Sequence, residues 1–337
     1  MTPSRKEQDN ILRWDGKKTG HYEVYYMKWN DFASRTAYWI RYTMTSPAPQ
    51  VGAPYCELWG TFFDASEPGK NFALKNRFPI EKLSWDKDKF GIRIAGAELA
   101  MNACHGKIAD EAKGNSLEWE VSFDSPDKTF YHLTPQRMYK GDFPKTKALA
   151  PHHDARFTGK VIANGREIKF SNARGQQTHL WGVKHAHRWA WGHCNTFKED
   201  DEAVWEGLDG QIKLGPIKSS HLKLFYLKYK GKSHYFNVFP KWFTNKSNWE
   251  LAHWTFDARD KEIRMVGEIS ARYEDFVAVT YMDPDGDPLW CNNTELADIK
   301  ISVYDSAGVK LGDLTSAMGC ASEYVDRKTY PEVPVKI

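Results

Sequence analysis

The sequence lacks the segments that direct a chain into or across a membrane. Its first residues, MTPSRKEQDN, are polar and contain no apolar core of a signal peptide. No run of 18 apolar residues occurs, so no transmembrane segment is expected. We therefore expect a cytoplasmic protein.

Paired cysteines, an excess of one charge and the common catalytic motifs are also missing. The 5 Cys residues show no CxxC spacing, and an odd count without an export signal indicates free thiols in a reducing compartment. The 47 basic and 44 acidic residues leave a net charge of +3 and form no basic block, so nucleic acid is not an expected partner. GxSxG, Walker A, GxGxxG and metallohydrolase patterns are absent.

Aromatic residues are abundant: they make up 14 % of the chain and include 14 Trp, a residue common in pockets. Short segments rich in β-branched and aromatic residues follow one another, whereas helical periodicity is scarce. The predicted strands are 21–29, 36–45, 55–63, 90–94, 117–123, 157–162, 212–214, 221–229, 234–239, 249–256, 263–273, 276–281 and 299–304. This pattern predicts an all-β fold of barrels or sandwiches.

One segment, GQQTHLWGVKHAHRWAWGHCNTF, concentrates histidine and tryptophan and holds 4 of the 12 His. Residues i and i+2 share a face of a strand, so His179 should project with Trp181. The same rule aligns Trp189, Trp191 and His193 along one face. The segment therefore predicts a wall of indole and imidazole groups.

Asn195 is next in line on that face. Buried imidazole and amide groups cost about 1–3 kcal/mol each when they are unpaired. A network satisfied within the core is one interpretation; a pocket wall is the other, and the concentration of polar groups in one segment favours it. A metal site is a third, because His185 and His187 share a strand face and neutral imidazole binds zinc. No single face collects three His, so we assign no metal ligand.

Glu23 leaves two possibilities open, because it shares a strand face with Tyr25. If Tyr22, Val24 and Tyr26 face the core, Glu23 is solvated. If the other face lines a barrel, Glu23 is an interior carboxyl group whose pKa rises with desolvation and which can act as an acid.

Four stretches resemble carotenoid 1,2-hydratase and AttH-like proteins and, more distantly, tocopherol cyclases. They are 20–28 (GHYEVYYMK), 157–170, 175–182 (GQQTHLWG, similar to an HxWG signature) and 189–197 (WAWGHCNTF, similar to the W-W-x-x-C-N-x-F strand of the cyclases). The resemblance implies two tandem lipocalin-like (calycin) antiparallel β-barrels with a pocket at or near their junction. It also implies cofactor-independent, non-redox chemistry on an isoprenoid or polyene: hydration, cyclisation or isomerisation.

On this basis we expect a flexible N-terminal tail at 1–19, a first barrel at 20–170 and a second at 171–337, with a boundary uncertain by about 15 residues. The stretch 140–154, KGDFPKTKALAPHHD, contains two Pro and no strand pattern, so we interpret it as a surface crossing.

His179 and Trp181 match the hydratase's functional His-x-Trp pair, and we expect the loss of His179 to reduce turnover most. The hydratase's later acid has no clear counterpart, because this chain offers His193 and Asn195 there and Asn cannot donate a proton as an acid. The candidate catalytic residues are His179, His193 and Glu23, and the candidate substrate-binding residues are Trp181, Trp189, Trp191, Asn195 and Tyr25. A non-catalytic carrier of a hydrophobic small molecule remains the alternative function.

We expect a polyene or a prenylated aromatic compound to quench the protein's Trp fluorescence, because Trp residues are dense in this one segment. Trp189→Ala should weaken that binding. A fluorescence titration of both proteins measures the effect, and an unchanged curve for the variant would place the pocket elsewhere.

Overall fold

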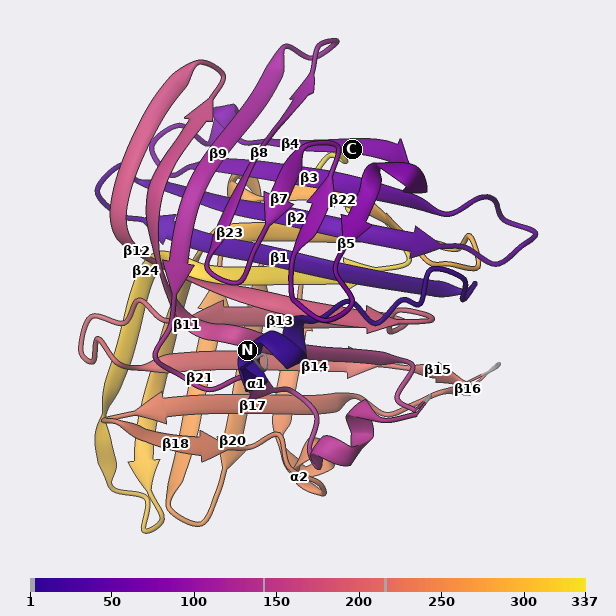
Figure 1. Ribbon diagram of the computed structural model, residues 1–337. Helices are drawn as coiled ribbons and strands as arrows, with labels where there is room; N and C mark the ends of the chain where they lie inside the picture. The colour runs from indigo at the N-terminus through magenta and orange to yellow at the C-terminus, as the bar shows by residue number, and fades with distance from the viewer. Residues whose placement is uncertain (1–3, 142, 215–216) are drawn as a thin grey trace.

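Two antiparallel sheets make up most of the regular structure in the computed structural model, which describes residues 4–141, 143–214 and 217–337 (Figure 1). The predicted all-β fold class is confirmed. The first sheet contains β1 (His21–Asp31), β2 (Thr36–Ser46), β3 (Tyr55–Asp64), β4 (Phe72–Pro79), β5 (Leu83–Trp85), β6 (Ile92–Ile94), β7 (Ala97–Leu99), β8 (Ala103–Asp110), β9 (Asn115–Asp124), β10 (Phe130–Tyr131), β11 (Thr146–Ala163) and β12 (Arg166–Gly182). The second contains β13 (Arg188–Cys194), β14 (Val204–Gln211), β17 (Leu222–Tyr229), β18 (Lys232–Tyr235), β19 (Lys246–Glu250), β20 (His253–Arg259), β21 (Ile263–Ser270), β22 (Val277–Met282), β23 (Pro288–Asp305) and β24 (Lys310–Asp326).

The remaining elements are short. Strands β15 (Lys213–Leu214) and β16 (Ile217–Lys218) pair with each other. The helical elements are α1 (Arg5–Asn10), α2 (Lys241–Thr244) and four 3-10 turns, Pro68–Lys70, Ile80–Lys82, Gln136–Tyr139 and Tyr273–Asp275. Within the described ranges, no helix has the length and apolar character needed to span a membrane.

The first sheet curls around its own core. Its strand order is β4-β3-β2-β1-β12-β11-β9-β8-β7-β6-β5, with β10 paired to β11. Strands β3 and β4 also contact β8 and β9, which lie far from them in that order. The enclosed core is aromatic: the rings of Trp29 and Phe157 stack with their centroids 5.0 Å apart.

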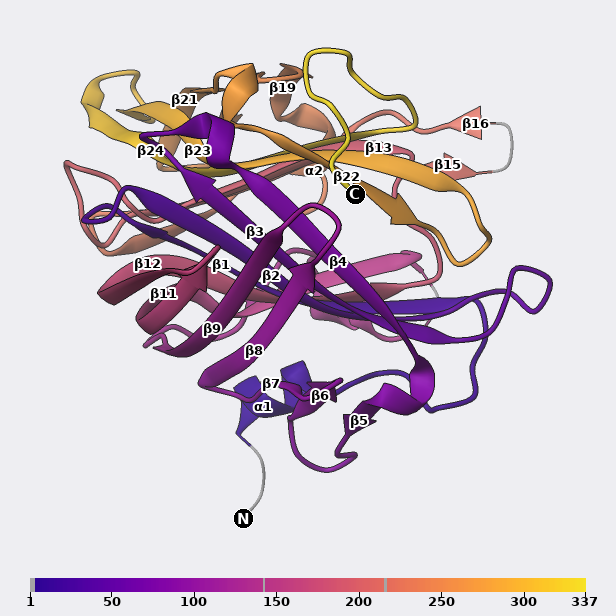
Figure 2. The ribbon, with the colours of Figure 1, turned by 90° about the horizontal axis from the view of Figure 1, so that it is seen from above.

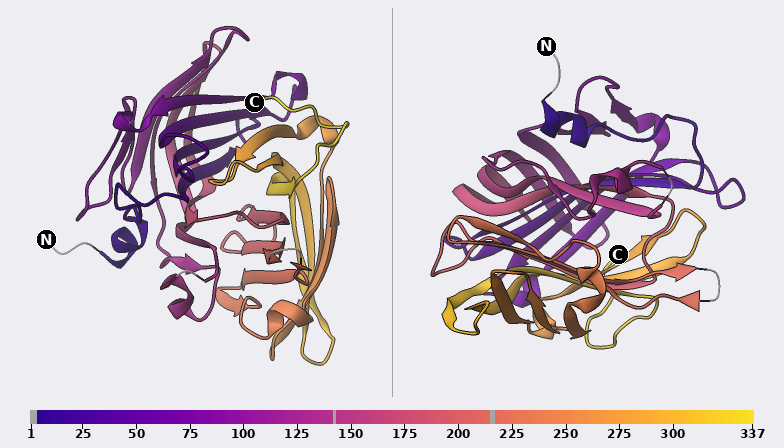
Figure 3. Two further views of the ribbon diagram at one scale, coloured as in Figure 1. Left: turned by 90° about the vertical axis from the view of Figure 1, so that its right-hand side faces the viewer. Right: turned by 90° about the horizontal axis from the view of Figure 1, so that it is seen from below.

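The second sheet has the order β18-β17-β14-β13-β24-β23-β21-β20-β19, with β22 paired to β23. Its own core contains Trp205 and Phe256, whose ring centroids lie 4.7 Å apart. Further views show the two sheets packed side by side (Figure 2, Figure 3). Contacts of β23 with β1 and β2, and of β22 with β4, join them.

A third apolar cluster fills the layer between the sheets. On β1, alternation places Met27 and Trp29 in the first core, whereas Val24 and Tyr26 face the second sheet. Trp191 on β13 meets Tyr26 edge-on, with ring centroids 5.7 Å apart. Because β1 and β2 are buried along their whole length, both of their faces carry apolar residues.

The chain passes from the first sheet to the second after residue 182. Strand β12 continues unbroken to Gly182, and β13 begins at Arg188. The sheets therefore change several residues after the expected division at 170–171, because the Asn164-Gly165 turn is followed by a strand of 17 residues.

The interpretation of 140–154 as a surface crossing is wrong from Thr146 onward, because β11 begins there. His152 and His153 are buried within this strand. The register of β11 on β12 shifts on both sides of His152, which is the signature of β-bulges. These shifts interrupt the alternation, so the sequence shows no strand pattern there.

Residues 4–19 pack onto the first sheet, so the expected flexible tail is wrong for this part of the chain. Helix α1 is capped by Ser4, whose hydroxyl accepts from the Glu7 amide. Asn10 is buried and exchanges hydrogen bonds of 3.0 and 3.2 Å with the Gln177 side chain of β12. The buried polar groups of β12 require such partners, which a mobile tail would not provide.

Residues 249–256 form a hairpin and not the single strand that their composition predicts. Strand β19 ends at Glu250 and β20 begins at His253. The turn residues Leu251 and Ala252 are apolar, and Ala252 adopts a φ of 69°. None of the usual turn residues marks the position, so this turn could not be predicted from residue types.

Candidate functional site

A cavity of about 640 Å³ lies between the two sheets. Tyr26, Arg41 and Leu180 line it from the first sheet, and Trp189, Trp191 and Glu323 line it from the second. Its wall is mainly apolar, and the polar groups of the lining include the buried side chains of Arg41, His132 and Glu323. An apolar wall with a small number of placed polar groups is usual for a small-molecule site.

Stacked rings form one side of this cavity. The His185 ring lies parallel to Trp189 at a centroid distance of 5.8 Å and stacks on Tyr22 at 4.1 Å. Tyr281 extends the stack, with its centroid 6.5 Å from that of Trp189. This side offers π faces that can stabilise positive charge.

Glu323 is the buried acid of the cavity. It lies on β24, where its Cα partners are Trp191 on β13 and Asn293 on β23. Burial raises the pKa of Glu323 to about 7, although the Arg41 charge and hydrogen bonds with Trp189 and Cys291 oppose the rise. A carboxyl group with this pKa is protonated in about half of the molecules at pH 7 and can act as a general acid.

His185 is oriented by a carboxylate. Its Nδ1 lies 2.7 Å from Asp283 Oδ1, and Arg327 Nη2 donates to Asp283 Oδ2 at 2.7 Å. Burial lowers the pKa of His185 despite this contact, so the ring is neutral near pH 7. Asp283 accepts the Nδ1 proton, which leaves the lone pair on Nε2 and makes the ring a candidate base.

Glu206 gathers donors from several strands at the inner end of the cavity. Its carboxylate accepts from Trp191 Nε1 at 2.9 Å, His153 Nε2 at 2.6 Å, Gln176 Nε2 at 2.8 Å and His132 Nε2. These contacts hold the pKa of Glu206 well below its usual range, although burial alone would raise it. His132 also lines the cavity.

One group of described residues has the spacing of a metal site: His153, His193 and Glu206, whose ligand atoms lie within 4.8 Å of one another. Zinc accepts this donor set. The four donors already satisfy both Glu206 oxygens, so a metal ion would have to displace them. His185 and His187, the pair that the sequence suggested as possible zinc ligands, are not part of this group. His185 instead contacts Asp283.

Three predicted residues form a cluster outside the cavity. Glu23 Oε1 lies 2.7 Å from His179 Nε2 and accepts from the Tyr25 hydroxyl at 3.0 Å. The amides of Arg13 and Trp14 donate to the same carboxylate, so the N-terminal segment covers it. This cluster is a satisfied buried network.

Glu23 is buried in the interior, which is the second of the two positions considered from the sequence. Its pKa is lowered, whereas a raised pKa was expected for that position. Burial would raise that pKa, whereas hydrogen bonds from His179 and His21 lower it to about 2. His179 Nδ1 lies 3.0 Å from the Asp9 carbonyl oxygen, so both ring nitrogens face acceptors. Glu23 is therefore ionised and is no proton donor at neutral pH.

The remaining predicted residues divide between the cavity and its surroundings. Trp189 and Trp191 line the cavity. Trp181 lies beside His179, with the Arg13 guanidinium 5.1 Å from its ring centroid. The other two polar residues are held by the backbone and by a carboxylate: His193 Nε2 contacts the His153 carbonyl, and Asn195 Nδ2 donates to Asp154 and to the Gly175 carbonyl.

Strand parity explains the separation. On β12, Thr178 and Leu180 face the cavity, and His179 faces the opposite side with Glu23. Both faces of β12 are buried here. The alternation of the strand shows which residues share a face, but it does not show which of the two faces lines the cavity. The sequence pattern did not identify Arg41 or Glu323; the available signal was a charged residue beside an aromatic neighbour on its strand.

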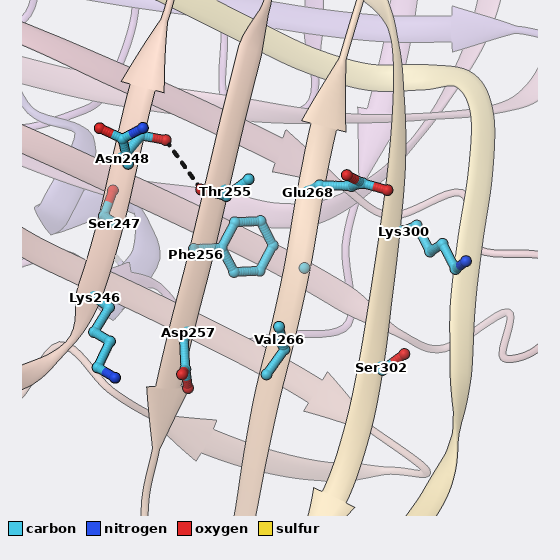
Figure 4. Close-up of a pocket in the computed structure, with 11 residues that line it drawn as sticks. Lys246, Ser247, Asn248, Thr255, Phe256, Asp257, Val266, Glu268, Lys300 and Ser302 are labelled. Atoms are coloured by element: carbon cyan, nitrogen blue, oxygen red, sulfur yellow. Dashed lines mark hydrogen bonds between the residues drawn. The ribbon is translucent and has the colours of Figure 1, made fainter.

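A second hollow of about 440 Å³ lies over β19, β20, β21 and β23 (Figure 4). Lys246, Asp257, Glu268 and Lys300 project from these neighbouring strands, with Phe256 between them. Gly267 adds no side chain, and a Cβ there would lie 2.5 Å from the Phe256 ring. The hollow carries ordinary surface charges and no aromatic wall.

The fold and the site define an all-β protein of two sheets with a mainly apolar cavity between them. This chain belongs to the tocopherol cyclase-like family, which its sequence matches over residues 59–323. Three of the four stretches that resemble the family lie within that range, and the predicted relationship is confirmed.

Sequence and structure comparisons find relatives along nearly the whole chain. An uncharacterized protein of Mycobacterium tuberculosis is 27% identical over 302 residues, covering 87% of this chain and 84% of that protein. CghA superposes with a TM-score of 0.61 at 8% identity, covering 96% of this chain and 93% of that chain. AttH from Nitrosomonas europaea gives 0.58 at 9%, covering 98% of each chain, and kievitone hydratase from Nectria haematococca gives 0.55 at 7%, covering 91% and 89%. These structures share the fold.

We expect Glu23→Gln to destabilise the protein near neutral pH. The variant should also lose less stability than the wild type as the pH falls from 4.5 toward 2. The pKa of Glu23 falls from 4.5 to about 2 on folding, so its stabilisation is complete above 4.5 and is lost as the pH falls toward 2. The shift corresponds to about 3 kcal/mol. Urea unfolding of wild type and variant across this pH range measures the effect.

Glu118→Gln, at an exposed position of β9, is the control. It should leave the dependence of stability on pH unchanged. Parallel stability curves for wild type and Glu23→Gln would mean that the Glu23 network contributes nothing at these pH values.

Proposed function

We propose that this protein is an enzyme that converts an apolar small molecule by acid–base catalysis in the cavity between the two sheets. One observation carries the proposal: a single mainly apolar cavity contains both a carboxyl group whose pKa is raised to about 7 and a neutral imidazole. The names of relatives support it, because the family is named for a cyclase and one structural neighbour is a hydratase. The proposed substrate is an isoprenoid, a polyene or a related natural product.

In this proposal Glu323 starts the reaction by giving its proton to a carbon–carbon double bond. The carbocation that forms lies against the indole faces of Trp189 and Trp191, each worth about 0.5–2 kcal/mol. The cavity also keeps the substrate folded against its apolar wall. These two contributions favour addition at one carbon over side reactions.

An oxygen nucleophile then forms the new carbon–oxygen bond. A hydroxyl group of the substrate closes a ring, and a water molecule gives hydration. The nucleophile loses its proton to His185 Nε2, which Asp283 leaves free by holding Nδ1. Proton transfer from His185 to Glu323 through solvent restores both groups, so ring closure is an isomerisation and hydration adds one water.

His179 and Glu23 have a supporting role in this scheme. They join β1 to β12 behind the cavity wall, because Tyr25 and His179 are direct Cα partners across these strands. The loss of His179 would then reduce turnover through the packing of this wall and not through proton transfer to the substrate.

The test is turnover of prenylated phenols and polyenes in D₂O, followed by mass spectrometry. Ring closure should yield a product one mass unit heavier than the substrate, because the acid delivers a deuteron to carbon. Glu323→Gln should lower the rate by about 10²–10⁴-fold, the usual contribution of a general acid.

Glu295→Gln is the matched control. Glu295 is also fully buried, its pKa is raised to about 8 by burial, and it is not among the residues that line the cavity. The control should turn over normally. Equal rates for wild type and Glu323→Gln would contradict the assignment of the acid, and binding without turnover would leave the carrier function as the better account.

A further inference from the structure

Arg41 is a buried cation in the wall of the cavity. It lies on β2, opposite Tyr26 on β1 and Trp59 on β3, and it is only 5% exposed. Its Nε and Nη1 atoms find no hydrogen-bond partner in the part of the chain that the structure describes. A buried guanidinium with free donors is costly unless something satisfies it.

Aromatic rings hold this guanidinium but do not satisfy its donors. Its central carbon lies 4.9 Å from the Trp39 ring centroid, 4.7 Å from that of Trp59 and 4.4 Å from that of Tyr281. Cation–π contacts of this kind attract the charge to the faces of the rings. They fix the position of the charge while the N–H groups at the edge of the guanidinium plane remain available.

Of the four other cations that line the cavity, Lys145 and Lys213 are exposed to solvent, and Lys184 and Arg327 are already paired. Lys184 contacts the carboxylates of Asp285 and Asp287, and Arg327 donates to Asp283 at 2.7 Å. The buried acid of the wall, Glu323, has a pKa that burial raises to about 7, so it supplies only a partial countercharge near neutral pH. The positive charge of Arg41 is therefore not fully compensated beside this mainly apolar cavity.

We infer that the molecule bound in this cavity carries an anionic oxygen, a carboxylate or an enolate, which Arg41 binds while the apolar remainder lies along the Trp189 wall. The inference rests on the proposed function, because it describes the substrate of the same cavity. Arg41 is then a binding and positioning residue: it fixes which double bond of the substrate lies beside Glu323. Arginine suits this task because its planar group offers several N–H donors to one acidic group.

Retinoic acid and retinol form a suitable probe pair, because they share one polyene skeleton and differ in a carboxylate against a hydroxyl group. Quenching of Trp fluorescence gives the Kd of each. We expect the wild type to bind the acid at least about tenfold more tightly than the alcohol. Arg41→Met should remove that preference by weakening the acid alone, and Arg41→Lys should keep part of it.

Lys75→Met is the matched control. The Lys75 ammonium lies 4.5 Å from the Trp59 ring centroid and donates to the Thr280 carbonyl, but Lys75 is outside the cavity lining. Its loss removes a nearby charge and should leave the preference intact. Thermal unfolding of each variant shows whether it is folded. If Arg41→Met does not fold, the preference of the wild type for the acid and its partial loss in Arg41→Lys test the inference.

Equal affinity of the wild type for both probes would overturn this inference and leave the proposed function standing. A preference that survives in Arg41→Met, or disappears in Lys75→Met, would also overturn it. Failure of the wild type to bind either probe would count against the apolar cavity itself, and hence against both proposals.

Discussion

Charge buried between two packed sheets is the constraint on which the rest of the structure depends. Each ion taken from water costs several kcal/mol unless nearby groups replace its hydration. Glu206 has four donors from strands and loops of both halves, and these donors hold the sheets in register. Arg41 has aromatic faces instead, and Glu323 lacks enough donors to stay ionised near neutral pH. The layer between the two sheets thus contains a carboxylate held firmly by its donors, Glu206, and two charged groups that can interact with a bound molecule, Arg41 and Glu323.

Two glutamates show how the number of donors decides the outcome at similar burial. Glu23 is contacted by two imidazoles, a phenol and two backbone amides, and its pKa is lowered to about 2. Glu323 is also buried, and its pKa rises to about 7. The first carboxylate ties the N-terminal segment to β1 and β12, whereas the second can exchange a proton with a bound molecule. Burial alone identifies neither role.

The fold was predictable where each strand carries its own signal. The aromatic pattern of 21–29 is a local feature, and β1 follows from it, whereas only the 157–162 part of β11 was predicted. The indole wall of Trp189 and Trp191 was predictable because alternation lies within one strand. Arg41 and Glu323 were not, because β2 and β24 come from opposite ends of the chain and meet only when the sheets pack. Parity could not place His179, because both faces of β12 are buried.

The titration of Glu323 is the most direct test of this view of the cavity. Infrared difference spectra between wild type and Glu323→Gln, with glutamate labelled by ¹³C, isolate the carboxyl band of this one residue across pH. We expect a protonated band that disappears with a midpoint near 7. A midpoint near the ordinary value of 4.5 would show an ionised, well-solvated carboxylate, and the cavity would then hold no acid at neutral pH.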